Sequence, residues 1–127
     1  MKLESAAVMG KNALELKPQI SGGILGTTGL VSVVFDNLGR VSTADLAYSA
    51  HAYLAQGLAE LAVEKANASG IRTVGFTGGA ACNQILAALM QQTVESAGLR
   101  FVQHQAVPAG DGGVSFGQAV VAGFGDF

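Results

Sequence analysis

The stretch that most constrains the fold is FTGGAACNQIL, residues 76–86, where an apolar run ends in Gly78 and Gly79 just before a helical pattern begins. A glycine pair between a strand and a helix has two explanations. It supplies a positive φ for a tight turn, or it lets a ligand lie against bare backbone. The N–H groups and the helix dipole at such a turn favour an anion such as phosphate. At this level both explanations stay open.

The order of elements around this turn predicts an α/β fold in one domain, residues 1–127. A strand at 72–77, a helix at 82–97 and a strand at 99–103 imply parallel pairing with a crossover. A loop and a short helix follow the second of these strands. The remaining expectations are a helix at 2–10, two short strands or an extended loop at 13–25, an ambiguous segment at 27–39, a long helix from 42 to 70, the loop at 104–113 and the last helix at 114–123.

Two of the expected helices rest on different signals. The long helix has Ser42 or Thr43 as an N-cap, Asp45 in its first turn and Gly70 at its end. In the ambiguous segment, valines favour a strand by propensity, whereas the apolar residues fall at helical spacing. We expect a helix there.

Composition excludes several classes of protein. The chain has 127 residues with a net charge of −2, and no apolar run reaches the ~18 residues that span a bilayer. We therefore expect no membrane or nucleic-acid partner. The single Cys82 and the lack of a secretory signal predict a cytoplasmic protein. Only 13% of residues are charged and 50% are hydrophobic. This composition indicates that something else covers much of the surface of the chain.

A second glycine cluster surrounds Asp111, which lies between Gly110 and the pair Gly112–Gly113 at the start of a helix. Such an Asp is either an Asx-turn residue or a carboxylate held out for a metal. Both glycine clusters follow neighbouring strands of the predicted parallel sheet. Their loops are therefore expected to open at the same carboxyl-terminal edge, where ligands bind in such folds.

Four other polar residues have more than one interpretation. Asn83 either reads a ribose or base beside the glycines or caps the helix locally. His51 is interpreted as a hydrogen-bonded core histidine rather than a ligand. His104 starts the loop towards Asp111 and is interpreted first as a solvated residue, with a position in the cleft as the alternative. Cys82 is interpreted as a small packing residue, because no base for a nucleophilic role can be identified.

The two glycine clusters together carry a resemblance. FTGGAACNQIL followed by VPAGDGGVSFGQAVVA resembles the carboxy-terminal part of HypF, the carbamoyltransferase family of [NiFe]-hydrogenase maturation. KLESAA is similar to the family's Leu-Glu-Ala-Ala helix, and LAYSAHAYLAQGLAELA to the helix with its Phe-His pair. Here Ser49, Ala50 and His51 stand in that region without the Phe. The tRNA threonylcarbamoyl-transferase family shares this core, but the Gly-Gln ending and the Leu-Glu start favour HypF.

The resemblance implies an α/β fold that is part of an actin-like ATPase (ribonuclease-H-like) domain, with helices packed on a mixed sheet. It implies transfer of a carbamoyl group from carbamoyl-adenylate to the C-terminal cysteine of HypE. The cofactors would be ATP or AMP and a divalent metal, Zn, Fe or Mg. The site residues implied are Gly78 and Gly79 on the nucleotide phosphate, Asn83 on the nucleoside, Asp111 on the metal, and Gly112 and Gly113 beside it.

The chain also departs from the family pattern. The family's metal site uses a His-x-x-x-His pair, whereas this sequence has only His51 and His104. We therefore expect an N-terminal half or a partner subunit to supply it, a HypE-like acceptor as partner, no activity of the chain alone, and a homodimer that covers its open face. The alternative is a non-enzymatic assembly or scaffold module that keeps the nucleotide-binding fold.

Overall fold

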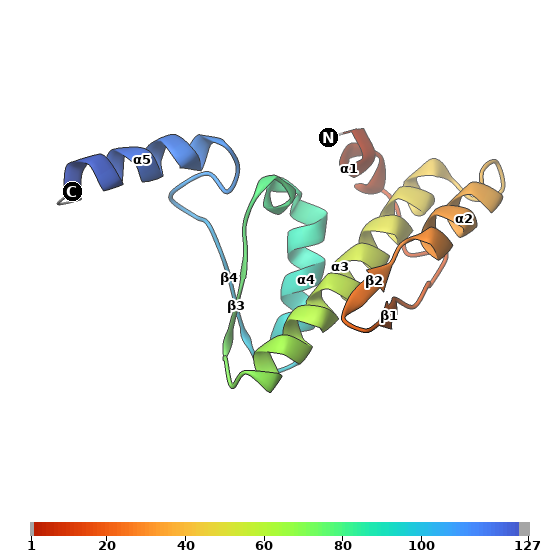
Figure 1. The fold of residues 1–127 in the computed structure, drawn as a ribbon. Coiled ribbons are helices and arrows are strands. Elements are labelled where there is room, and N and C mark those ends of the chain that lie inside the picture. Colours follow the sequence, from red (N-terminus) through yellow and green to blue (C-terminus); the bar gives the residue numbers. More distant parts are fainter. Residues whose placement is uncertain (1, 125–127) are drawn as a thin grey trace.

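A computed structural model describes residues 2–124 and has the expected α/β class (Figure 1). The chain combines helices with short strands, and the long central helix α3 runs through the middle of the molecule. The elements are α1 Lys2–Ala7, β1 Gln19–Ser21, β2 Ile24–Gly26, α2 Thr28–Asp36, α3 Thr43–Ala68, β3 Thr73–Phe76, the 3-10 helix η1 Gly79–Cys82, α4 Gln84–Ser96, β4 Arg100–Gln103 and α5 Gly112–Phe124.

The strands form two separate two-stranded sheets within residues 2–124, rather than one mixed sheet. Strands β3 and β4 are parallel, with Thr73 opposite Arg100 at one end, so the expected parallel pairing is confirmed. Strands β1 and β2 are antiparallel and are joined by Gly22 and Gly23. Both glycines have positive φ, 59° and 77°, a conformation that suits a two-residue hairpin turn.

The core lies where α3 and α4 pack together and against the β3–β4 sheet. Ala55 and Ala59 of α3 are completely buried, and these small side chains allow close packing with the neighbouring elements. Val94 of α4 is also completely buried. The core cluster consists of Ala55, Ala59, Ala66, Val74, Met90, Val94, Leu99 and Phe101.

The start of α3 is fixed by a capping arrangement that the sequence predicts. The Ser42 side chain accepts a hydrogen bond from the Asp45 N–H at 3.1 Å, as an N-cap should. The Asp45 carboxylate in turn accepts a hydrogen bond from the Lys11 N–H at 2.9 Å. That backbone bond is the main reason why the pKa of Asp45 is lowered. The segment before the hairpin is therefore tied to the first turn of α3.

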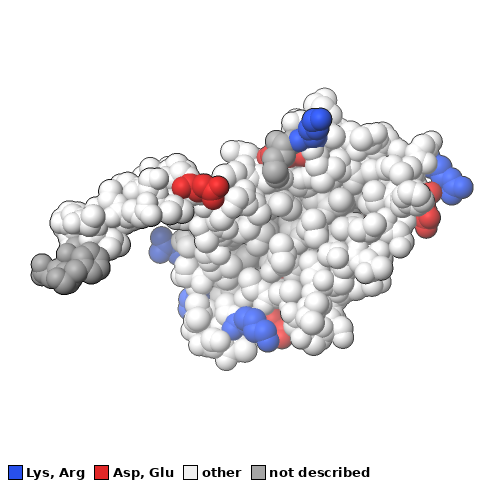
Figure 2. Space-filling view, turned by 45° about the horizontal axis from the view of Figure 1, so that its top comes forward, with Lys and Arg blue, Asp and Glu red and all other residues white. Residues whose placement is uncertain are grey.

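The surface is largely uncharged and apolar in places. In Figure 2 the charged side chains are few, and wide uncharged areas lie between the places where they gather. Helix α5 projects away from the rest of the molecule (Figure 1) and has no buried residue. Its apolar side chains are exposed, namely Val114, Phe116, Val120, Val121 and Phe124. No helix in the described part of the chain is long and apolar enough to cross a membrane.

Candidate functional site

The two glycine clusters meet at the carboxyl ends of β3 and β4. The Gly78 N–H donates a hydrogen bond to the Ala109 carbonyl oxygen at 2.9 Å. A Cβ added to Gly110 would lie 3.9 Å from both the Cys82 Sγ and the Gly79 Cα. The expectation that both loops open at one edge is therefore confirmed. These two segments, far apart in the chain, form one continuous surface.

Only the first glycine of the pair needs a positive φ. Gly78 has φ 89° and ψ −179°, whereas Gly79 begins the 3-10 helix η1 without a positive φ. The expected helix start at Cys82 is wrong, because η1 fills Gly79–Cys82 and α4 begins at Gln84. A Cβ on either glycine would meet nothing within 4 Å. The space above the turn is open, and the first N–H groups of η1 have no earlier helical turn to bond.

Asn83 lies inside the protein and not on the open surface. Its side chain is 2% exposed, and its Oδ1 accepts a hydrogen bond from the Leu86 N–H at 3.0 Å. The interpretation of Asn83 as a local helix cap is therefore confirmed. Its Nδ2 lies 2.9 Å from the Nε2 of His51, which is 4% exposed. His51 is the hydrogen-bonded core residue that the sequence indicated, while a nucleoside contact of Asn83 stays a prediction.

A second side chain serves the start of α4, and sequence reasoning missed it. The Glu4 carboxylate accepts a hydrogen bond from the Gln84 N–H at 2.8 Å. The only signal was the KLESAA segment, which resembles the family's Leu-Glu-Ala-Ala helix. Glu4 and Asn83 therefore satisfy the Gln84 and Leu86 N–H groups in the first turn of α4.

Asp111 is exposed at the start of α5, and its carbonyl oxygen accepts a hydrogen bond from the Val114 N–H at 3.1 Å. The turn thus uses the backbone of Asp111 and leaves the carboxylate outside. A Cβ on Gly113 would lie 2.4 Å from the Pro108 oxygen, so glycine is required there by close approach within the loop. Residues 2–124 contain no group of three or more His, Cys, Asp or Glu that could hold a metal. Asp111 could supply one ligand, and the other ligands would have to come from elsewhere.

His104 and Cys82 lie at the same edge. The His104 Nε2 lies 2.8 Å from the Thr77 Oγ1. This contact joins the first residue after β4 to the first residue after β3. Cys82 is exposed, and its Sγ faces Gly110, so it packs between two loops rather than in the core.

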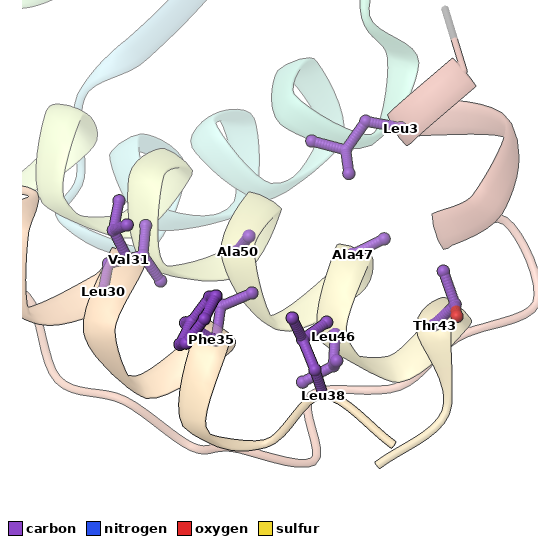
Figure 3. Close-up of a pocket in the computed structure, with 10 residues that line it drawn as sticks. Leu3, Leu30, Val31, Phe35, Leu38, Thr43, Leu46, Ala47 and Ala50 are labelled. Carbon is purple, nitrogen blue, oxygen red and sulfur yellow. The ribbon is translucent and has the colours of Figure 1, made fainter. Parts of the chain in front are cut away.

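A separate apolar groove of about 380 Å³ lies between α1, α2 and α3 (Figure 3). Thr43 is the one hydroxyl in its lining, so the groove offers little that could bind a phosphate. The groove includes Ala50, from the region in which the family has its Phe-His pair. The lining residues are Leu3, Leu30, Val31, Val34, Phe35, Leu38, Thr43, Leu46, Ala47 and Ala50.

Comparison with known proteins decides the family. Residues 1–118 match the family described as carbamoyltransferase, Kae1-like domain, second subdomain. The chain belongs to the HypF carbamoyltransferase family. It is 38% identical over 121 residues to the probable carbamoyltransferase HypF of Methanocaldococcus jannaschii, covering 94% of this chain and 16% of that protein. It is 34% identical over 103 residues to the HypF homologue of Cupriavidus necator, covering 79% of this chain and 26% of that protein.

Solved HypF structures have the same fold. The crystal structure of T. kodakarensis HypF matches with a TM-score of 0.83 and 36% identity over 97% of this chain and 16% of that one. Full-length HypF in its phosphate- and nucleotide-bound form matches with a TM-score of 0.78 and 21% identity over 95% and 16% of the two chains. The resemblance to the carboxy-terminal part of HypF is therefore confirmed. The chain spans about 16% of the length of these HypF chains. The activity of a whole HypF protein is therefore only a proposal for this chain.

Proposed function

We propose that this chain supplies the nucleotide-binding half of a HypF carbamoyl-transfer site. The reaction passes the carbamoyl group from carbamoyl-adenylate to the C-terminal cysteine of HypE during [NiFe]-hydrogenase maturation. The observation that carries the proposal is the hydrogen bond between Gly78 and Ala109, which joins both glycine clusters into one open cradle. Membership of the carbamoyltransferase family supports the same activity.

In this proposal the nucleotide phosphate lies against the backbone of Gly78 and Gly79. The absence of a Cβ at both positions allows close approach, and the space above them is open. The first N–H groups of η1 would donate to the phosphate oxygens. Gly112 and Gly113 would line the opposite side of the cradle.

The chemistry is an acyl transfer onto sulfur. The acceptor thiolate attacks the carbamoyl carbon, the bond from that carbon to the adenylate oxygen breaks, and AMP leaves with the electron pair. The thiol proton is released to solvent or to a base outside this chain. Fixed backbone donors at the phosphate would stabilise the charge that remains on AMP. The nucleophile belongs to the acceptor, so none is needed here.

A metal site cannot be built from the described residues alone. Asp111 supplies one exposed carboxylate, and residues 2–124 hold no group of three or more metal-binding side chains. A divalent ion such as Zn, Fe or Mg would therefore need ligands from the remaining part of the protein or from a partner subunit. We expect no carbamoyl transfer by the chain alone for this reason. The same observation keeps a non-enzymatic scaffold module as the second candidate.

The test is AMP binding by the complete carbamoyltransferase that contains these residues. A Gly79→Val variant should bind AMP on the order of tenfold more weakly, because its side chain would occupy the space above the turn. The control is Gly29→Val, where an added Cβ would lie 3.4 Å from the end of the flexible Gln19 side chain and far from the cradle in sequence. Unchanged affinity in folded Gly79→Val would rule out the cradle. No AMP binding by the unaltered protein would favour the scaffold.

A further inference from the structure

A buried chain of hydrogen bonds connects the middle of α3 to the end of the glycine turn. The Asn83 Nδ2 lies 2.9 Å from the His51 Nε2, and the His51 Nδ1 lies 2.7 Å from the Ala47 carbonyl oxygen. His51 is 4% exposed and Asn83 is 2% exposed. An apolar side chain would fill a core position on α3 without needing hydrogen-bond partners. A buried imidazole with a partner at each ring nitrogen therefore requires its own explanation.

The partners determine where each proton lies. The Ala47 carbonyl oxygen can only accept, so the Nδ1 of His51 carries a hydrogen and donates it. The neutral ring then presents an acceptor at Nε2, which takes a hydrogen bond from the Asn83 Nδ2. The Asn83 Oδ1 faces the Leu86 N–H at 3.0 Å and accepts from it. The ring tautomer and the amide orientation are each fixed from both sides.

These hydrogen bonds hold one end of the glycine turn, which is the segment that carries the proposed phosphate donors. Asn83 directly follows η1, and its own N–H donates to the Ala80 carbonyl oxygen at 3.0 Å. The other end is held by the bond from Gly78 to Ala109 at 2.9 Å. His51 projects from a 26-residue helix, which is a rigid support. The turn is therefore fixed at both ends before any ligand binds, which is the condition for preorganised binding.

We propose that His51 is a positioning residue: acting through Asn83, it fixes the backbone donors of the glycine turn in the geometry that binds the nucleotide phosphate. The inference rests on the proposed function for the identity of the ligand. The positioning of the turn by His51 is a separate statement about the unliganded chain, and it can be measured without nucleotide.

The first experiment uses NMR on the unliganded 127-residue chain. Imidazole nitrogen spectra should show His51 as the neutral Nδ1–H tautomer. A His51→Leu variant should shift the backbone amide signals of Gly79 and Ala80, because Asn83 loses its acceptor. A His51→Gln variant, whose Oε1 replaces the acceptor near the Nε2 position, should restore most of these shifts. A wild-type Nε2–H tautomer, or unshifted turn signals in His51→Leu, overturns the inference.

The second experiment measures AMP affinity in the complete carbamoyltransferase, well below the melting temperature. His51→Leu should weaken AMP binding on the order of tenfold, and His51→Gln less than about threefold. Val94→Ala is the matched control, since Val94 is a completely buried core residue of α4. It should lower the melting temperature and leave the affinity unchanged. Equal loss of affinity in Val94→Ala and His51→Leu would show general destabilisation and overturn the inference. A wild-type protein that binds no AMP overturns the proposed function instead, and the amide spectra still decide the role of His51.

Discussion

The Glu4 carboxylate accepts a hydrogen bond from the backbone N–H of Gln84, although the two residues lie 80 positions apart in the chain. The bond ties α1 to the first turn of α4, directly after the glycine turn. A carboxylate at a helix start satisfies a backbone donor and also interacts favourably with the helix dipole. The short first helix thus stabilises the same end of α4 that Asn83 caps.

Replacing Glu4 with Ala should lower the free energy of unfolding by about 1 kcal/mol, because the Gln84 N–H loses its charged acceptor. The measurement is thermal or urea unfolding of the full chain. Glu64→Ala is the control, since the Glu64 side chain is 62% exposed and its ion pair with Lys65 is 3.8 Å long. Equal stability of the two variants would contradict a capping role of Glu4.

The two glycines of the turn should respond differently to alanine. Gly78→Ala should destabilise the protein by about 1–3 kcal/mol, because φ 89° with ψ −179° is a conformation that L residues rarely adopt. Gly79→Ala should change stability by less than about 0.5 kcal/mol, since Gly79 lacks a positive φ and faces open space. Urea unfolding of both variants measures the difference. A larger loss at Gly79 would refute this assignment of backbone strain.

Replacing Asp111 with Asn distinguishes between two roles of this residue, as a metal ligand or as part of the turn. The turn uses the Asp111 carbonyl oxygen, which the substitution keeps, so the melting temperature should stay unchanged. If the carboxylate binds a hard cation, the neutral amide should abolish metal-dependent carbamoyl transfer in the complete protein. Metal content and carbamoylation of the acceptor thiol are the readouts. Full metal occupancy and full activity in the Asn variant would show that Asp111 is structural.

Asp45 should make stability depend on pH at the acid end. Its pKa in the folded chain is lowered from 3.8, chiefly by the hydrogen bond from the Lys11 N–H. The folded state therefore favours the ionised carboxylate. This stabilisation is fully present above pH 3.8 and is lost as the pH falls through the lower folded pKa. The difference in melting temperature between wild type and Asp45→Asn should shrink over that range, whereas a constant difference would contradict the assignment.

Exposed apolar side chains on α5 predict self-association of the isolated chain. Phe116 and Val121 are 55% and 53% exposed and lie on a helix without buried residues. Such a surface is normally covered by another subdomain or a second copy. Light scattering at tens of micromolar should show a dimer, and the double substitution Phe116→Ser with Val121→Ser should shift it towards monomer. A wild-type monomer at that concentration would contradict the prediction.

The sequence predicts the elements well where one signal dominates. The long helix from Ser42 and the two strands around α4 are where the pattern indicates. The ambiguous segment is helical because Leu30 is buried, a tertiary contact that overrides the strand propensity of its valines. The first helix ends at Ala7 and not at Gly10. A Cβ on Gly10 would lie 2.1 Å from the Ala44 oxygen, so that glycine serves close packing.

The site is less predictable than the fold because its contacts join residues far apart in sequence. The two glycine loops meet because β3 and β4 are parallel, and the sequence predicts this meeting. The bond between His51 and Asn83 spans 32 positions, and that between Glu4 and Gln84 spans 80. No periodicity or local spacing encodes such pairs. The 3-10 helix was missed because the Gly-Gly-Ala-Ala run has the composition of a plain turn.

The β3–α4–β4 unit pairs its two strands within a short length of chain, with Thr73 opposite Arg100 and Phe76 opposite Gln103. Closing this loop costs less entropy than closing the much longer loop that joins Glu4 to Gln84. We therefore expect this unit and α3 to collapse early during folding. The first helix would dock late and lock the glycine turn only after the sheet has formed. Slow folding of the chain would then be traced to the arrival of its N-terminal segment rather than to the pairing of its strands.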